Sequence, residues 1–419
     1  MRNVVGAALG FLLSSSLCAQ DWPGWRGAGH DGKASGFQAP ASWPEELRRG
    51  WQVEVGEGHA SPALADGRYF LHVRQGDSEV ALCLDAATGK ELWREALEVK
   101  YDPPPDAKSY GKGPFASPLV AGGRVYTFGI KSTLSCLDAR TGKLLWRADF
   151  KDRFPKPEAE WGTAASPVLV DGKVVVHVGG GPGKHRDGKG RGGVVALDAA
   201  DGTVKWAWEG DCAGSATPVP VTVGGVPQLV TQTESLAVGL SPADGKLLWE
   251  LEFKSQYNQN AVTPVVLGDL AILSGYQMGV RAYRIGGPKP EPAWQTREAS
   301  MFMSSPILKG DRLYGFSEMG SGQFFCLDAK SSETMWTGEA RQGTNAALVD
   351  AGAVLLGLVT PGPTDRKPSH LVVFGATDKE YEEKARYKVS DGPAFAHPVL
   401  SGKTIAIKDR TKFALWTLP

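Results

Sequence analysis

Histidine is the side chain best suited to bind a metal or transfer protons near neutral pH, but only 7 of the 419 residues are histidines. His30 and His59 could each offer an imidazole nitrogen, yet neither has a second ligand at metal-site spacing. The sequence also lacks the G-x-S-x-G elbow of hydrolases, the H-E-x-x-H helix of zinc proteases and the C-x-x-C-H haem attachment site. We therefore predict no catalytic residues and no metal ligands.

The basic segment 179–193, GGGPGKHRDGKGRGG, is the second place where chemistry could occur. Its glycines could present backbone N–H groups to an anion, beside the side chains of Lys184, His185, Arg186, Lys189 and Arg191. It is not a phosphate-binding P-loop, because no G-x-x-x-x-G-K-[ST] is present. Two interpretations stay open: contact with an acidic partner or phosphate, or a solvated surface insertion without a ligand.

Charge and composition limit the classes of partner that this protein could bind. The chain has 46 basic and 46 acidic residues, so no net field attracts nucleic acid or an anionic membrane. We expect a monomer that recognises its partner locally, without nucleic acid. With 53 Gly, 13 Trp and only 6 Met, the composition favours many short strands joined by tight turns over long helices.

The first 19 residues have the pattern of a secretory signal peptide: Arg2, an apolar stretch over 4–13, and Ala19 at the cleavage position. No later run approaches the roughly 18 apolar residues of a membrane-spanning helix. Cys18 raises the question of lipid anchoring, which we expect not to occur because Ser15 and Leu17 do not match a lipobox. We predict a periplasmic or secreted protein.

A repeat runs through the rest of the chain. Each unit begins with an apolar run that usually follows Ser-Pro or Thr-Pro and ends in D-x-x-x-G-x-x-x-W. The eight starts are at Ser61, Ser117, Ser166, Thr217, Thr263, Ser305, Asn345 and His397. The repeat tryptophans are Trp51, Trp93, Trp146, Trp206, Trp249 and Trp336, with Trp294 and Tyr387 standing in for two others.

Each unit divides into four short runs separated by glycine-containing turns, in the first unit 62–65, 68–73, 80–85 and 91–95. Four antiparallel strands make one blade of a propeller, and the large tryptophan on the outer strand would fill the wedge between blades. Burying each of these rings contributes about 2–3 kcal/mol. The sequence therefore predicts an all-β, eight-bladed propeller over 49–419, preceded by a leader over 20–48.

The two ends of the chain are expected to meet in one blade. The last unit, 397–419, has room for only three strands, whereas the segment RGWQVEV at 49–55 carries an additional repeat tryptophan, Trp51. An N-terminal strand that completes the eighth blade would remove an exposed sheet edge. The ring should thus be closed without a covalent bond.

The cysteines are expected to be free. Cys83, Cys136 and Cys326 occupy the same position in different repeats, so neighbouring copies should lie about 10 Å apart, the spacing of packed sheets. A disulfide needs Cα atoms within about 7 Å. We predict small buried apolar side chains at these positions.

The half-repeat, the count of eight and the Ser/Thr-Pro starts closely resemble the pyrroloquinoline-quinone-like (PQQ-like) propeller family, which includes quinoprotein alcohol dehydrogenases and the BamB outer-membrane assembly proteins. The leader DWPGWRGAGHDG, 21–32, is similar to that of a subgroup of exported propellers. In the dehydrogenases of this family, the resemblance implies, a quinone lies on the propeller axis against a ring formed by two adjacent, disulfide-bonded cysteines. A Ca²⁺ ion is bound beside it. Because this chain has no Cys-Cys pair and no matching Glu, Asn and Asp set, we expect no cofactor.

Loop length distinguishes the two faces of the propeller. The long segments, 99–115, 151–164, 179–193 and 360–369, all belong to the face where the first strands are entered and the second and third are joined. Function concentrates in loops on a rigid scaffold. The residues just before each first strand should converge there and could bind a small polar molecule or peptide, or simply fill the inner end of the wedge: His59, Phe115, Trp161, Asn260, Met303, Asn345 and Phe395. We expect His397 to do no more than hydrogen-bond a neighbouring strand.

A fold of this type does not fix a chemistry. Our leading hypothesis is a non-catalytic binding or scaffold protein that holds an envelope protein or a small molecule through its long-loop face. One alternative is a PQQ-dependent quinoprotein dehydrogenase, which would need PQQ and Ca²⁺. Another is a BamB-like role in outer-membrane protein assembly.

Overall fold

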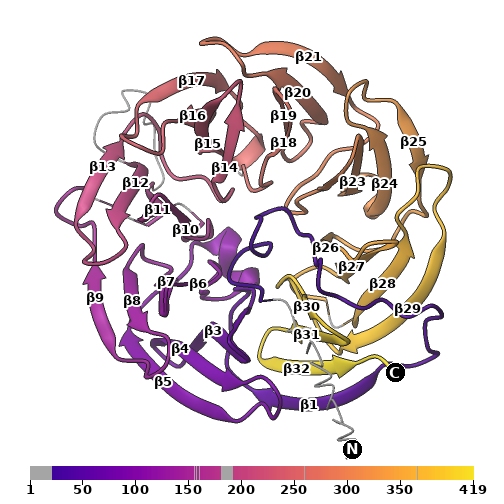
Figure 1. The fold of residues 1–419 in the computed structure, drawn as a ribbon, viewed down its shortest axis with the longest axis horizontal. Coiled ribbons are helices and arrows are strands. Elements are labelled where there is room, and N and C mark those ends of the chain that lie inside the picture. Colours follow the sequence, from indigo (N-terminus) through magenta and orange to yellow (C-terminus); the bar gives the residue numbers. More distant parts are fainter. Residues whose placement is uncertain are drawn as a thin grey trace, which may run out of the picture.

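A computed structural model describes residues 21–419 except 155, 157, 160, 181–191, 259 and 366. The predicted signal peptide, Cys18 and the five basic residues of the segment 179–193 lie outside the described residues. Eight four-stranded antiparallel sheets surround a central axis (Figure 1). The predicted eight-bladed all-β propeller is confirmed.

Blades 1 to 4 follow one another along the chain. Blade 1 contains β2 (Ala63–Ala65), β3 (Arg68–Gln75), β4 (Ser78–Asp85) and β5 (Glu91–Glu98). Blade 2 contains β6 (Leu119–Ala121), β7 (Arg124–Phe128), β8 (Leu134–Asp138) and β9 (Leu144–Ala148). Blade 3 contains β10 (Val168–Val170), β11 (Lys173–Gly179), β12 (Gly192–Asp198) and β13 (Val204–Trp208). Blade 4 contains β14 (Val219–Val223), β15 (Val226–Gln232), β16 (Leu236–Leu240) and β17 (Leu247–Glu252).

Blades 5 to 8 complete the ring. Blade 5 contains β18 (Val265–Leu267), β19 (Leu270–Ser274), β20 (Val280–Arg284) and β21 (Glu291–Thr296). Blade 6 contains β22 (Ile307–Lys309), β23 (Arg312–Ser317), β24 (Gln323–Asp328) and β25 (Thr334–Thr337). Blade 7 contains β26 (Asn345–Asp350), β27 (Val354–Thr360), β28 (Ser369–Gly375) and β29 (Glu383–Ser390). Blade 8 contains β30 (Val399–Ser401), β31 (Thr404–Lys408), β32 (Lys412–Thr417) and β1 (Arg48–Glu54).

Turn chemistry sets the strand ends. Asp66 and Gly67, between β2 and β3, have φ of 49° and 69°. Positive φ at both central residues gives the tight hairpin turn that matches the twist of the strands. In blade 1, β3 and β5 run longer than predicted, because β3 pairs with β4 as far as Gln75 opposite Ser78, and β4 with β5 as far as Ser78 opposite Glu98.

The two chain ends meet as predicted. Strand β1 pairs with β32 in antiparallel register, with Trp51 opposite Leu415 and Val53 opposite Phe413 (Figure 1). The Trp51 ring packs edge-on against Phe413, 5.3 Å between centroids, and its Nε1 donates to the Ala86 carbonyl of blade 1 at 3.1 Å. The N-terminal strand therefore both completes blade 8 and contacts the next blade.

Most of the repeat tryptophans join their blade to the next one, whereas Trp249 donates to Gln228 within its own blade. Trp93 Nε1 donates to the Ala139 carbonyl at 3.1 Å, and a Cβ added to Gly142 would lie 2.5 Å from the Trp93 ring. The glycine of one D-x-x-x-G turn is thus needed because the tryptophan of the preceding blade lies against it. Trp294, in β21, makes the same kind of bond to Ala329, so its predicted position on the outer strand is correct.

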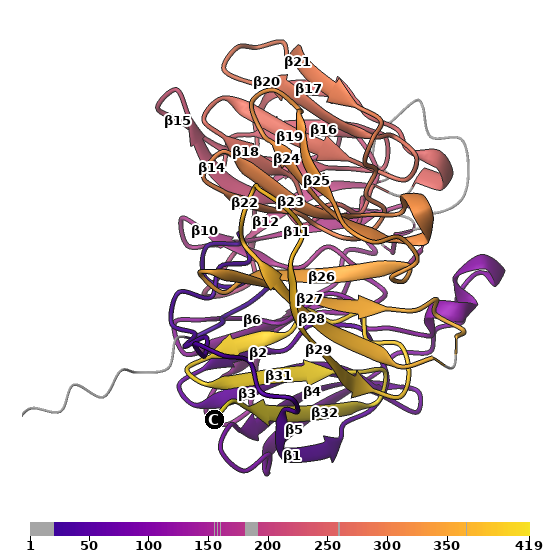
Figure 2. The ribbon, with the colours of Figure 1, turned by 90° about the vertical axis from the view of Figure 1, so that its right-hand side faces the viewer.

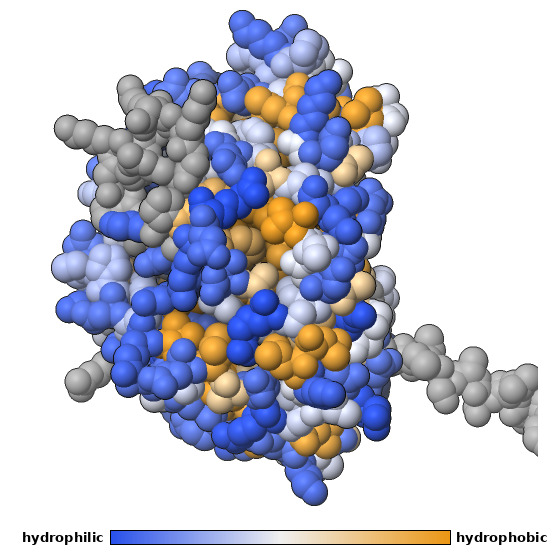
Figure 3. Space-filling model, turned by 90° about the vertical axis from the view of Figure 1, so that its left-hand side faces the viewer, coloured by the Kyte–Doolittle hydropathy of each residue, from blue (hydrophilic) through white to orange (hydrophobic). Residues whose placement is uncertain are grey.

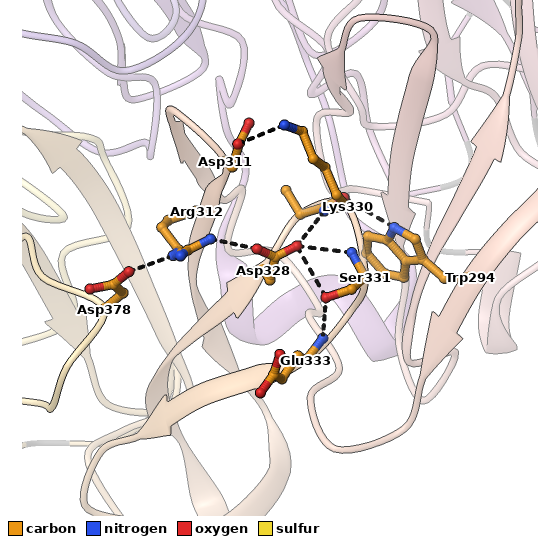
Figure 4. A network of polar contacts seen from close by, with 9 residues as sticks. Trp294, Asp311, Arg312, Asp328, Lys330, Ser331, Glu333 and Asp378 are labelled. Atoms are coloured by element: carbon orange, nitrogen blue, oxygen red, sulfur yellow. Dashed lines mark hydrogen bonds and ion pairs between the residues drawn. The ribbon is translucent and has the colours of Figure 1, made fainter.

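Figure 4 shows this junction between blades 5, 6 and 7. Asp328 caps its turn by accepting hydrogen bonds from the amides of Lys330 and Ser331, both at 2.9 Å. Arg312 forms an ion pair with the Asp328 carboxylate at 2.5 Å. It forms a second ion pair at 2.8 Å with the carboxylate of Asp378, which lies in the β28–β29 turn of blade 7. The aspartate of the repeat therefore shapes a turn and anchors an ion pair between blades.

A second set of contacts joins the blades near the axis. The amides of four start residues donate to the hydroxyl of the next start: Ser61 to Ser117, Ser117 to Ser166, Ser166 to Thr217 and Thr263 to Ser305, at 3.0–3.1 Å. The amide of His397 donates to the Ser61 Oγ at 2.8 Å, across the junction of blades 8 and 1. The Ser/Thr of the repeat is thus an inter-blade acceptor.

The leader lies across the short-turn face of the propeller, the face that carries the β2–β3 type of hairpin (Figure 2). Trp22 exchanges two backbone hydrogen bonds with Leu64 of blade 1, at 2.7 and 2.8 Å. Arg26 is fully buried and donates to the Pro306 carbonyl of blade 6 at 2.5 Å. Further contacts reach blades 2, 5, 7 and 8, through Val120, Thr263, Asp350 and Gly402. The leader therefore covers the axis on this side.

Cys83, Cys136 and Cys326 are free and buried, as predicted. Burial raises the pKa of each of these thiols, which keeps them protonated. None of the helices in the described part of the chain has the length and apolar character needed to cross a membrane.

Deleting residues through Val55 should abolish cooperative unfolding, because β32 would lose its partner and the ring its closing strand. The measurement is thermal unfolding by calorimetry and circular dichroism. A chain that lacks only the residues before Arg48, and so keeps β1, should melt at a lower temperature but still in one sharp transition. The prediction fails if the chain without β1 melts as sharply as the intact one.

Candidate functional site

An apolar cavity of about 200 Å³ lies on the axis, and we call it the axial pocket. Its floor includes Trp25 of the leader, whose Nε1 donates to Thr263 Oγ1 at 3.1 Å. Its walls come from residues that precede first strands and from the short helix η1 (Pro105–Tyr110). The ring-bearing side chains around it are Trp25, His59, Tyr110, Phe115, Trp161, Phe302 and Phe395.

His59 behaves as a neutral aromatic ring in this pocket. It stacks on Phe115, 5.9 Å between centroids at 11°, and packs edge-on against Phe395 at 4.9 Å. Its Nε2 lies 3.0 Å from the Tyr110 carbonyl, so Nε2 carries the proton and donates it. Burial, together with the charge of Lys408, lowers the pKa of His59 to about 3. The part of the pocket wall formed by His59 is therefore uncharged at neutral pH.

A buried ion pair holds the loop that carries η1. Arg74 donates to the carbonyls of Val99 and Lys112, at 2.9 and 3.1 Å, near the two ends of this loop. It also donates to Glu79 at 3.2 Å, and the same carboxylate oxygen accepts the amide of Ile130 in blade 2 at 2.9 Å. Both charged side chains are about 3% exposed. The pair thus fixes the position of the wall formed by η1.

A larger cleft, about 1180 Å³, adjoins the axial pocket, and we call it the side cleft. Tyr110 and Phe302 line both cavities. The side cleft is formed by loops of blades 5, 6 and 7, including the short helix η3 (Met319–Ser321). These loops lie on the same face as η1 and the third short helix, η2 (Gln256–Asn258), opposite the leader (Figure 2).

Charges in the side cleft are of two kinds. Glu318 is held by the protein, because its carboxylate accepts the amide of Gln277 at 2.6 Å and the hydroxyl of Ser300 at 2.9 Å. Arg297, Arg341 and Lys367 are exposed and form no ion pair within the described residues. The cleft therefore offers cationic groups that an anionic ligand could pair with.

The structure brings together five of the seven residues expected at the channel mouth: His59, Phe115, Trp161, Met303 and Phe395 line the axial pocket. Asn345 lines the side cleft instead. Asn260 is buried between blades 4 and 5, where its Nδ2 donates to the carbonyls of Thr233 and Phe253 at 2.9 and 2.5 Å. Its amide donors are thus used within the scaffold, and it does not line the axial pocket.

Several lining residues were not anticipated from the sequence. Trp25 lies in the leader, which has no repeat pattern to place it. Tyr110 belongs to the long segment 99–115, which the sequence places on the functional face. An aromatic residue in this segment could therefore have been predicted to line a binding site. Arg297 and Arg341 lie in the loops that lead into β22 and β26. The repeat does not predict these positions, because the length of such loops varies from unit to unit.

The outer rim is a weaker candidate. Figure 3 shows one side of it, where apolar patches are separated by hydrophilic side chains. The large exposed apolar residues on outer strands are Leu92, Leu145 and Val204, each about 45% exposed and each in a different blade. Scattered apolar residues of this kind are normal on a soluble surface.

Comparisons with known proteins agree with the geometry. The family model described as outer membrane protein assembly factor BamB (PQQ_2) matches residues 76–338. The chain belongs to the PQQ-like β-propeller family. Its solved relatives include BamB from Moraxella catarrhalis, with a TM-score of 0.62 at 12% identity over 89% of this chain and 98% of that one. At this identity, the likeness concerns the fold.

Curated relatives of this PQQ-like propeller fall into two functional groups. A quinohaemoprotein alcohol dehydrogenase, ADH IIB of Pseudomonas putida, is 28% identical over 51% of this chain and 28% of its own length. The BamB protein of Yersinia pestis is 24% identical over 57% of this chain and 60% of its own length. The matched region is thus under two thirds of either relative.

The residues around the axial pocket do not fit the quinone cofactor for which the family is named. Pyrroloquinoline quinone is a tricarboxylate, and the pocket lining has no Lys or Arg to pair with it. Calcium needs about six to eight oxygen ligands, and the only carboxylate in this lining is the exposed Asp106. Nowhere among the described residues do three or more His, Cys, Asp or Glu side chains gather as metal ligands.

Substituting Arg74→Met should loosen the loop at 99–112 and destabilise the protein by about 3–5 kcal/mol, because it leaves the Glu79 carboxylate buried without its partner. Hydrogen exchange should speed up in this loop but not in blade 4. The double variant Arg74→Met/Glu79→Leu should recover part of the stability, since no unpaired charge remains. Unchanged exchange in the single variant would show that the pair does not hold the loop.

Acid should destabilise the protein in part through His397, whose ring packs edge-on against Trp25 at 4.4 Å. Burial, with Arg26 nearby, lowers the pKa of His397 to about 3, from 6.5. Between these values the unfolded chain binds a proton and the folded chain does not, so stability falls as pH falls. His397→Ser, which restores the repeat residue, should remove this contribution, about 1.4 kcal/mol per pH unit at most.

Denaturant unfolding of both proteins between about pH 7 and pH 4 measures this difference, and the other buried histidines cancel in the comparison. Above about pH 7 the gap between the two proteins should be constant. Parallel stability curves over the acid range would show that His397 does not contribute.

Proposed function

We propose that this PQQ-like propeller is a non-catalytic binding protein of the cell envelope that holds a protein partner through its long-loop face. The proposal is carried by one observation: the axial pocket and the side cleft are neighbours that share Tyr110 and Phe302 in their linings, and both lie on that face. Concave surfaces lined by aromatic groups with a few polar ones are typical binding sites.

The chemistry of the lining supports binding over catalysis. A catalytic site needs an acid, base or nucleophile with a partner that activates it. In the axial pocket His59 is a neutral ring whose proton is donated to a backbone carbonyl. The side-cleft carboxylate of Glu318 is used by Gln277 and Ser300.

One of the two groups of relatives supports the same direction. The relatives named BamB are outer membrane protein assembly factors by description, and the family model that matches this chain carries that name. A related task for this protein, lending a rigid surface to an envelope partner, would need no cofactor. The predicted signal peptide is consistent with that location.

Photo-crosslinking in the source cells tests the proposal. A photoreactive residue in place of Lys108, exposed on η1, should capture a discrete envelope protein. The same residue in place of Arg140, exposed on the short-turn face in the β8–β9 turn, is the matched control and should capture none. Equal capture from both positions, or from neither, would contradict the proposal.

The dehydrogenase alternative has a separate test. Purified protein is supplied with pyrroloquinoline quinone, Ca²⁺ and a panel of alcohols and sugars, and dye reduction is followed together with the quinone absorbance. We expect no turnover, since the axial lining offers no charged partner for the quinone carboxylates. Substrate-dependent reduction would replace the binding proposal with a catalytic one.

A further inference from the structure

The axial pocket has the size and polarity of a receptor for one ring-bearing side chain. A cavity of about 150 Å³ lined by apolar side chains accommodates benzene, so about 200 Å³ accommodates a phenyl or indole ring. Phe115, Phe395 and Met303 supply apolar walls, and Trp25 closes the floor. Because the leader covers the opposite side of the axis, a ligand must enter from the long-loop face.

The side cleft favours negative charge beside that ring. Arg297, Arg341 and Lys367 have no ion pair within the described residues, whereas its two carboxylates are already engaged. Glu318 accepts two hydrogen bonds, and Asp365 accepts the amide of Gly362 at 3.1 Å. Three cationic side chains against two carboxylates leave the cleft lining with one net positive charge, and the cations have no ion-pair partner in the described part of the chain, so an acidic ligand is the complementary one.

Exposed aromatic groups extend this surface. Tyr257 on η2 is 61% exposed and lies 6.4 Å from Tyr276, which in turn lies 5.0 Å from Phe302, the residue shared by both cavities. Met319 on η3, 41% exposed, lies in the side-cleft lining. Tyr, Met and Arg are the residue types enriched where proteins bind proteins.

We propose that the partner presents an acidic peptide segment that places one aromatic side chain in the axial pocket and its neighbouring carboxylates in the side cleft. This rests on the proposed binding function and specifies the chemistry of the partner. A buried aromatic anchor surrounded by polar contacts is the usual energetic centre of such an interface. An acidic polysaccharide would also pair with the cations, but its hydroxyl groups would be desolvated in the axial pocket without partners.

The test uses the full chain and a short fluorescent peptide with one tryptophan flanked by aspartates and glutamates, with binding followed by anisotropy. Replacing the peptide tryptophan with alanine should weaken binding about thirtyfold, the effect of losing one buried ring. Replacing the carboxylates with amides should weaken it about tenfold, and added salt should reduce only that part. These comparisons leave the protein unchanged.

Variants of the protein locate the two contacts. Ala261→Trp fills the axial pocket and should abolish the preference for the tryptophan peptide over the alanine peptide. Arg297→Ala/Arg341→Ala should weaken binding of the acidic peptide about tenfold and leave the amide peptide unaffected. Arg140→Ala/Lys143→Ala removes the same charge from the β8–β9 turn on the other face and should change neither.

The results separate this proposal from the one on which it rests. If crosslinking captures a partner from Lys108 but no acidic aromatic peptide binds, the binding function stands and the acidic aromatic chemistry is wrong. An oligogalacturonate that binds with dependence on the two arginines, but is unaffected by Ala261→Trp, would overturn the peptide in favour of a polysaccharide. Peptide binding that survives both sets of substitutions would place the site elsewhere and overturn the proposal.

Discussion

The pairing of β1 with β32 turns a row of sheets into a ring, and the position of every other functional feature depends on that ring. Without β1, blade 8 would end in an unpaired edge and would lose the outer strand that contacts blade 1. Trp51 links the two blades by its bond to Ala86. Because the ring is closed, the residues before the eight first strands converge on one axis, and side chains from distant parts of the chain form a common pocket.

The characteristic residues of the repeat mainly form the contacts between neighbouring blades. Trp93 reaches Ala139 and lies against Gly142 of the next blade, so the tryptophan of one unit and the glycine of the following unit form one structural element. At the axis, Ser61 and Ser117 supply the matching inner contact. Because the blades are held to one another at both their outer and their inner edges, most of the long loops are not needed to hold the ring together. The sequences of these loops can therefore vary to suit a ligand.

This division explains what could be predicted from the sequence. The strands, the closure by Trp51 and the free Cys83 follow from a period that the chain repeats many times, and all three are found in the structure. The site is only partly accessible to the same reasoning. His59 and Phe395 converge because they precede first strands, but Asn260, at a similar position, is turned into the scaffold by the carbonyls of Thr233 and Phe253.

The residues that were missed lie where the period gives no information. Trp25 reaches the pocket from a leader that has no counterpart in the repeat, and only the folded ring determines which blade it meets. Arg341 lies in a loop whose backbone departs from the repeat, with φ of 64° and its amide bonded to the Gly320 carbonyl. A cleft formed by three blades is defined by their relative placement, which no single segment encodes.

The same scaffold serves dehydrogenases and assembly factors, so the lining and not the fold distinguishes one role from the other. A quinone site requires charged groups on the axis, and charge on the axis must be stabilised by partners in a region of low dielectric. Here the leader inserts Trp25 at the floor, and burial keeps His59 neutral. Among the described residues, the unpaired positive charge of the side cleft lies on exposed side chains, where water solvates it in the absence of a ligand. An apolar centre with a charged periphery is the arrangement of a protein-binding surface.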